Sequence, residues 1–319
     1  MATTVDDLIQ SVRDATDEDN QDYLTTEQIL KALDRGQRNA TNIISRKYPD
    51  LFTESVDITT DGEYNYSLPT SAAGRRITHV ESYQQQIAYP LQRISEQQAT
   101  LYRSNSQTSR PLYYIMYKNH IQLVPRPTAG VVIKLYYLKR SQPLVQQQGR
   151  VVEIDTVNNL IALDAIGSSI STISTGFGSY VNFIDYNTGA IKGTCQVAAI
   201  DTTNNELTFK TSGLTRTEVL GLTVSTAIPT DLAADDYICL VTGTCVPELD
   251  DVYCDYLLQY AVVDVRRRFG EPLQEELIAL DKIGKELEAM WAGRNPPGRI
   301  RKANSAYVNP AGSLLRYFQ

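Results

Sequence analysis

Apolar residues near the N-terminus recur every three or four positions, which is the spacing of one face of an α-helix. The first such stretch predicts a short helix over 5–15. A second begins after Thr25, where Thr25 and Gln28 have the spacing of a capping box, and Pro49 ends it. The sequence therefore predicts two helices before residue 50, each with one apolar face that needs a partner.

The helical period returns near the C-terminus. A helix predicted over 248–269 is apolar around most of its circumference, so we expect it to be buried on several sides. Gly270 stops it, and Pro272 lies in the first turn of a further helix whose apolar stripe runs from Leu273 to Trp291. The two ends of the chain thus carry helices that could cover one another's apolar faces.

Between residues 51 and 139 the apolar period changes to two, which indicates half-buried β-strands. Residues 118–120 and 125–130 have the composition of turns. Ten of the 20 tyrosines of the chain fall between residues 51 and 139. The predicted strands are 55–58, 64–68, 77–83, 113–118, 121–125 and 131–138.

Residues 150–230 are rich in Thr, Ser, Asn and Gly and contain an internal repeat. The segment 152–163 resembles 198–209, with the core Ile-Asp-Thr-x-Asn-Asn repeated after 46 residues. Asn tolerates positive φ, so each Asn-Asn pair predicts a tight hairpin turn between two strands. Two hairpins with neighbouring strands predict a small antiparallel barrel or sandwich, inserted as a separate unit.

These patterns together predict an α+β protein. Its adaptor-like core would comprise residues 1–145 with 231–292, in which helices from both chain ends form a bundle beside an antiparallel β middle. Residues 146–230 would form the inserted small β-barrel or sandwich domain. Residues 293–319 have neither period, and we expect an extended C-terminal arm.

Composition and charge narrow the possible functions. The chain has 319 residues, 42% of them hydrophobic, which is enough for about two folded domains. The net charge is −7, so binding of nucleic acid phosphates cannot be the main use of the surface. The charge is uneven: residues 1–24 carry −6, whereas 294–319 carry five cations and no acid. The excess of Tyr is typical of protein interfaces.

Side chains that could carry out catalysis or bind a metal are sparse and scattered. The four cysteines have no CxxC spacing, which predicts reduced, mostly buried thiols in a cytosol-like compartment. His79 and His120 are the two histidines, one in a predicted strand and one at a predicted turn. The Asp235-Asp236 and Asp250-Asp251 pairs fit a solvated loop and a helix N-terminus. We expect no catalytic, cofactor or metal site and no membrane segment.

The order of these elements resembles the head-to-tail adaptor (connector) proteins of tailed bacteriophages. The similarity is carried by helical segments near both ends, by a Tyr-rich β segment and by the strand that leads into the apolar helix. It touches most of residues 1–145 and 237–292, and leaves the insert outside the common pattern. The segments concerned are 5–13, 25–38, 111–127, 131–137, 237–241, 246–249 and 259–272.

The resemblance implies a structural virion protein that is assembled in the host cytoplasm. Such adaptors form a homo-oligomeric ring, a dodecamer in this family, docked beneath the portal protein and offering a platform to a tail nozzle or tail-tube protein. Double-stranded DNA would pass through the lumen without specific binding during genome ejection. An acidic charge repeated around the ring would keep DNA from adhering.

The resemblance further implies that the C-terminal arm reaches the portal. The basic charge of the arm would suit an acidic groove, and its aromatic residues would act as anchors. The expected portal-binding residues are Arg299, Arg301, Lys302, Tyr307, Leu314, Leu315, Arg316, Tyr317 and Phe318.

Two other classes of function remain open from the sequence. The Thr- and Asn-rich insert and the many tyrosines would also suit a receptor- or glycan-binding tail module. An enzyme, such as a glycan hydrolase with a carboxylate pair, is the third class, and no motif supports it.

Overall fold

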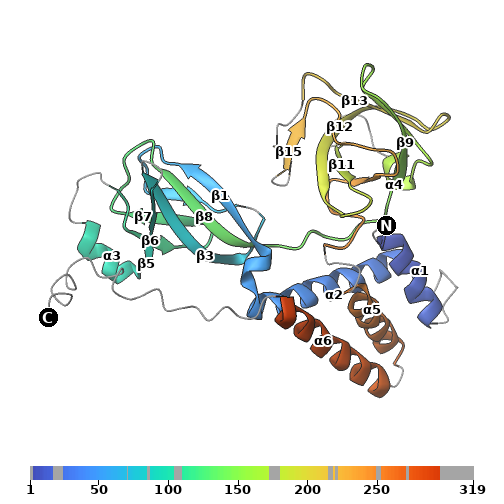
Figure 1. Cartoon of the computed structure of the whole chain (residues 1–319), viewed down its shortest axis with the longest axis horizontal. Helices are drawn as coiled ribbons and strands as arrows, with labels where there is room; N and C mark the ends of the chain where they lie inside the picture. Colours follow the sequence, from blue (N-terminus) through green and yellow to red (C-terminus); the bar gives the residue numbers. More distant parts are fainter. Residues whose placement is uncertain are drawn as a thin grey trace.

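The computed structural model describes residues 3–16, 24–69, 71–84, 87–103, 110–171, 180–214, 218–219, 222–248, 253–270 and 273–294. Figure 1 shows three regions: a β-sandwich, a β-barrel and a group of helices below them. Helices and antiparallel sheets occupy separate regions, so the predicted α+β class is confirmed.

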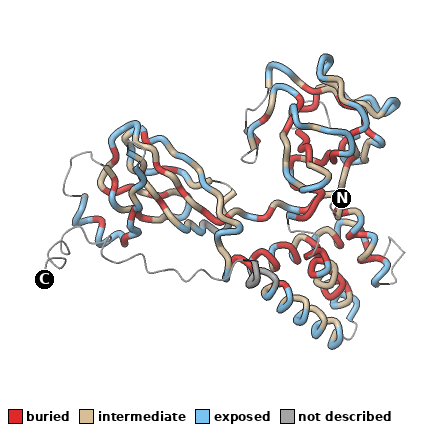
Figure 2. Tube along the Cα trace, in the orientation of Figure 1, coloured by how far each residue is buried: buried red, intermediate tan, exposed pale blue. Residues whose placement is uncertain are grey.

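The helical region consists of α1 (Val5–Thr16), α2 (Thr26–Lys47), α5 (Cys254–Phe269) and α6 (Gln274–Arg294). Side chains from all four helices share one apolar core, which Figure 2 shows as buried segments along α2 and α5. Helix α5 packs against α1, α2 and α6, so helices from the two ends of the chain bury one another.

Helix α2 begins where its sequence signals place it. The Thr25 side chain accepts from the Gln28 backbone, and the Gln28 side chain accepts from the Thr25 N–H, which completes the capping box. In the middle of α2, Gly36 faces Tyr260 of α5 so closely that a Cβ atom there would lie 3.3 Å from the Tyr260 ring. The glycine therefore lets the two helices approach.

A short 3₁₀ helix, η1 (Pro49–Phe52), leads from α2 into the sandwich. The first sheet has the order β1 (Thr53–Thr59), β8 (Val132–Lys139), β3 (Ala72–Gln84), β4 (Ile87–Pro90). The second has the order β2 (Asn65–Ser67), β7 (His120–Val124), β6 (Tyr113–Met116), β5 (Gln92–Arg93). Side chains from both sheets form one core between them.

Three elements of the sandwich have no counterpart in the sequence prediction: β4, β5 and helix α3 (Glu96–Arg103). Helix α3 lies on the second sheet, where Ala99 is fully buried in a small separate core with Ile94 and Ile115. These segments are eight residues long or shorter, which is too short for a clear period to mark them.

The barrel closes through six strands: β9 (Gly149–Asp155), β10 (Leu160–Leu163), β13 (Glu206–Phe209), β12 (Ile191–Asp201), β11 (Tyr180–Ile184) and β16 (Tyr237–Leu240). Strand β12 also pairs with β15 (Leu222–Ser225), which pairs with β14 (Glu218–Val219), and a short helix, α4 (Ser168–Ser171), follows β10. The barrel strands extend to Leu240, ten residues beyond the predicted end of the insert at 230, because β16 pairs with both β9 and β11.

The repeat predicted from the sequence is also a structural repeat. In the β9–β10 hairpin Glu153 pairs with Ala162, and in the β12–β13 hairpin Ala199 pairs with Thr208, each shifted by 46 residues. The bulges lie at corresponding positions, and the turns contain Asn159 at φ 52° and Asn205 at φ 58°. The hairpins pair through β10 and β13, with repeat-equivalent Ile161 and Leu207 opposite each other. The predicted hairpin turns are confirmed.

Candidate assembly surfaces

The three regions meet where the chain crosses between them, at 140–148 and 241–248. The fully buried Gln37 of α2 bonds to both crossings: its Nε2 donates to the Gln142 carbonyl (2.9 Å), and its Oε1 accepts from the Glu248 N–H (3.2 Å). The buried hydroxyls of Thr41 and Ser141 are 3.1 Å apart. A buried amide that serves two segments fixes both relative to the helices, because an unpaired buried polar group is costly.

Helix α1 is bound to the crossings in the same way. The Val5 N–H donates to the Cys245 carbonyl (2.9 Å), and the Asp6 carboxylate accepts from the side chain of Gln146 and the backbone of Gln147. Burial raises the pKa of Asp6, although these hydrogen bonds oppose the shift. The Gln148 side chain accepts from two N–H groups of α4, so the polar run 146–148 joins the helices to the barrel.

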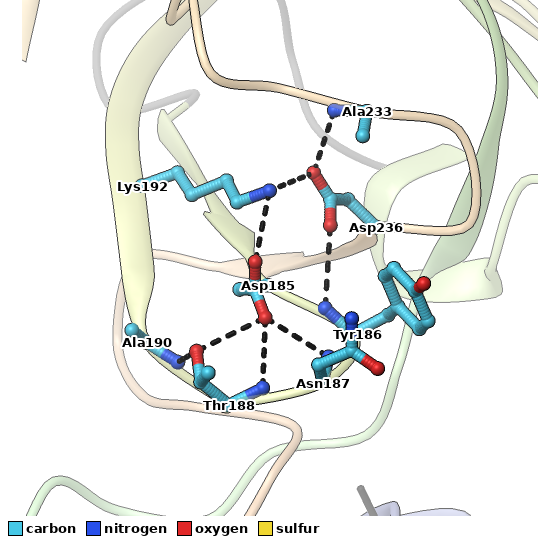
Figure 3. A network of polar contacts seen from close by, with 8 residues as sticks. All are labelled: Asp185, Tyr186, Asn187, Thr188, Ala190, Lys192, Ala233 and Asp236. Carbon is cyan, nitrogen blue, oxygen red and sulfur yellow. Dashed lines mark hydrogen bonds and ion pairs between the residues drawn. The ribbon is translucent and has the colours of Figure 1, made fainter. Parts of the chain in front are cut away.

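A charged network holds one end of the barrel together (Figure 3). The Lys192 ammonium lies 3.0 Å from an oxygen of Asp185 and 2.8 Å from one of Asp236. The fully buried Asp236 also accepts from the N–H groups of Ala233 (2.8 Å) and Tyr186 (3.2 Å). Every charged group in the network therefore has a partner, as buried charges require.

The reading of Asp235-Asp236 as a solvated pair is wrong for Asp236. A buried carboxylate is stable here because Lys192, 44 residues away in sequence, supplies the counter-charge. Hydrogen bonds from the Thr188 N–H and then from Lys192 hold the pKa of Asp185 far below its usual range. The turn that carries Asp185 packs against the second crossing, since a Cβ atom on Gly189 would lie 2.7 Å from Val246.

The outer face of the first sheet carries a polar cluster around Glu81. Its carboxylate pairs with His79 Nε2 (3.0 Å) and accepts from the hydroxyls of Tyr83 (3.0 Å) and Tyr136 (3.2 Å). Burial raises the pKa of Glu81, but these hydrogen bonds outweigh it and the net shift is downward. His79 thus belongs to a structural cluster on an open sheet face. The second histidine, His120, stacks on Tyr117 with ring centroids 4.8 Å apart.

The other sequence candidates divide into two groups. All four cysteines are free and buried, which confirms the predicted buried, unpaired thiols. The nine expected portal-binding residues and Asp250-Asp251 lie outside the described residues. Within the described ranges, no three His, Cys, Asp or Glu side chains gather as a possible metal site. In that same part of the chain, no helix combines the length and apolarity that a bilayer crossing needs.

The sequence analysis did not identify Gln37, which bonds to both crossings, or Lys192, which pairs with two carboxylates within the barrel. Gln37 and Lys192 have no local motif, because their partners lie far away along the chain.

Comparison with known proteins identifies a family that the chain resembles. The model of the SU10 adaptor protein family matches residues 3–166, just over half of the 319 residues. No curated protein matches the chain.

Proposed function

Because this chain belongs to the SU10 adaptor protein family, we propose that it is a structural subunit that joins the portal of a tailed bacteriophage to the tail. The family is structural rather than catalytic, so the function lies in the surfaces of the protein. The observation that carries the proposal is the match over residues 3–166, which includes α1, α2, the sandwich and the first barrel hairpin.

The adaptor acts as a closed ring of copies, a dodecamer by resemblance to other phage adaptors. DNA passes through the lumen of this ring during ejection. Each copy contributes a net charge of −7, and a ring of such copies repels the DNA phosphates, so DNA slides without adhering. The fixed junction around Gln37 supports this role, because a subunit between two partners must hold its binding surfaces in constant relation.

Electron microscopy of purified protein and of virions tests the ring. We expect closed rings of this chain between portal and tail. A particle in which this chain lies elsewhere, or purified protein that never forms rings, contradicts the proposal.

The C-terminal arm is the proposed portal contact, through the nine residues from Arg299 to Phe318. Its five cations and absence of acids would complement an acidic portal groove. Deletion of 299–319 should abolish binding to purified portal protein and leave the circular dichroism spectrum of the folded regions unchanged. Portal binding by the truncated chain would contradict this role.

A further inference from the structure

The sandwich has an end that points away from the helices. Strand β1 leaves η1 at Thr53 and ends at Thr59, which pairs with Val132, and Val132 pairs in turn with Tyr83. Gln84 follows Tyr83 and pairs with Ile87, so Ile87 lies at the end of the sandwich opposite η1. We call this the distal end.

Large apolar side chains are exposed at the distal end. Ile87 is 54% exposed and Leu112 is 46% exposed. The backbone of Leu112 is held on both sides, because its N–H donates to Val124 (3.1 Å) and its carbonyl accepts from Gln92 (3.0 Å). Exposed apolar groups on a fixed backbone are suited to binding, since little conformational entropy is lost when a partner covers them.

Two arginines accompany these apolar groups. The Arg110 guanidinium lies 3.6 Å from the centroid of the Tyr89 ring, which holds it in place, and Arg93 is exposed on β5. In the described part of the chain, neither guanidinium forms an ion pair with a carboxylate. Residues 84–113 contain three arginines and a single acid, Glu96, whose carboxylate accepts from the Tyr117 hydroxyl.

We name Ile87, Tyr89, Arg93, Arg110 and Leu112 the distal patch. It is a basic and apolar surface on an acidic protein: residues 1–293 carry 37 acids against 25 cations. Arg and aromatic side chains next to apolar groups are typical of binding hot spots. The patch would not pair with itself, because its cations would repel one another.

We propose that the distal patch docks on an acidic surface of a second copy of this chain. The inference rests on the proposed ring and names one of the surfaces that forms it. A basic patch that meets an acidic surface elsewhere on the next copy is a head-to-tail contact, and such contacts generate rings when the rotation closes. Charge points to a second copy as the partner, because residues 1–293 of each copy carry the excess of acids that would complement the basic patch.

Charge reversal in the full-length protein tests the contact. R93E/R110E should weaken self-association at least tenfold in analytical ultracentrifugation, with an unchanged circular dichroism spectrum. R76E/K118E makes the same charge change at exposed sandwich positions away from the distal end, and should assemble as the wild type does. Assembly of R93E/R110E at wild-type strength would overturn the inference and leave the ring intact. A wild-type chain that stays monomeric would overturn both.

A second experiment identifies the partner surface. R93K/R110K keeps the charges and supplies primary amines, which a zero-length carbodiimide couples to carboxylates. In rings assembled from isotopically labelled and unlabelled copies, we expect amide links from position 93 or 110 to an Asp or Glu of the other isotope. Rings without such intermolecular links would place another surface at the contact and overturn the inference.

Discussion

The barrel and the helical region bury their cores in opposite ways. The barrel core comes from one continuous stretch of chain, from Val151 to Ile238. The helical core joins α1 and α2 to α5 and α6, which are separated by more than 200 residues. Figure 2 shows buried segments in both regions, yet of the two only the barrel completes its core from its own segment.

This difference suggests a division of roles. We expect the barrel to fold as a unit, because all of its core residues lie within one continuous segment. The helical region closes only when the C-terminal helices return to α2, and Gln37 bonds both crossings at that meeting point. Five experiments probe the two regions, and we take them from the largest expected effect to the smallest.

Removal of residues 249–319 should have the largest effect. Without α5 and α6, the apolar face of α2 that carries Leu33 and Ala40 loses its cover. We expect the backbone amides of α2 to lose most of their protection in hydrogen exchange, while those of the barrel keep theirs. Removal of 295–319 alone is the control and should leave α2 protected. Equal loss in α2 and the barrel would show that the regions fold as one unit.

Lys192→Met should destabilise the barrel by about 3 kcal/mol, because it leaves the buried Asp236 without its counter-charge. Denaturant unfolding monitored on barrel residues measures the loss. Lys210→Met on the same barrel is the matched control, and its effect should be close to zero. A loss below about 1 kcal/mol would contradict the role of the network.

The same network predicts a pH dependence. The pKa of Asp185 is lowered in the folded state, first by the Thr188 N–H and then by Lys192. A carboxyl with a lowered pKa stabilises the fold fully above its unfolded value near 4, and this contribution is lost as the pH falls. The barrel of the wild type should therefore weaken in acid, and a stability unchanged between pH 7 and pH 3 would contradict this account.

The two hairpins offer a comparison inside the barrel. Asn adopts positive φ more readily than Ala does. Asn159→Ala and Asn205→Ala should therefore each lower the stability of the fold by about 1 kcal/mol. Because the hairpins share register and bulge position, the two losses should agree closely. Thermal unfolding measures both. A large effect in one hairpin only would show that the two hairpins do not contribute equally to stability.

The smallest effect is expected on the surface of α6. Lys285 and Asp281 form an i,i+4 ion pair with both side chains more than 60% exposed. Lys285→Ala should change stability by about 0.3 kcal/mol, because water screens such pairs. A loss above about 1 kcal/mol in thermal unfolding would show that α6 depends on this pair.

Local signals in the sequence predicted much of this fold. The capping box at Thr25 and the left-handed Gly270 that ends α5 act within a few residues, so their outcome can be read from the chain alone. The six strands predicted between 51 and 139 each match an observed strand. The sequence did not predict helix α3 or strands β4 and β5, since tertiary contacts rather than periodicity define such short segments.

By itself, the sequence determined the four helices of the helical region, six strands of the sandwich and the repeated Asn-Asn turns, because each depends on neighbours within about ten residues. Only the tertiary structure decided that β16 closes the barrel and that Asp236 is buried beside Lys192. The same holds for Arg93 and Arg110, which the fold brings to one exposed end. The physical reason is common to all three: the partner of each group lies far along the chain, and folding alone brings it near.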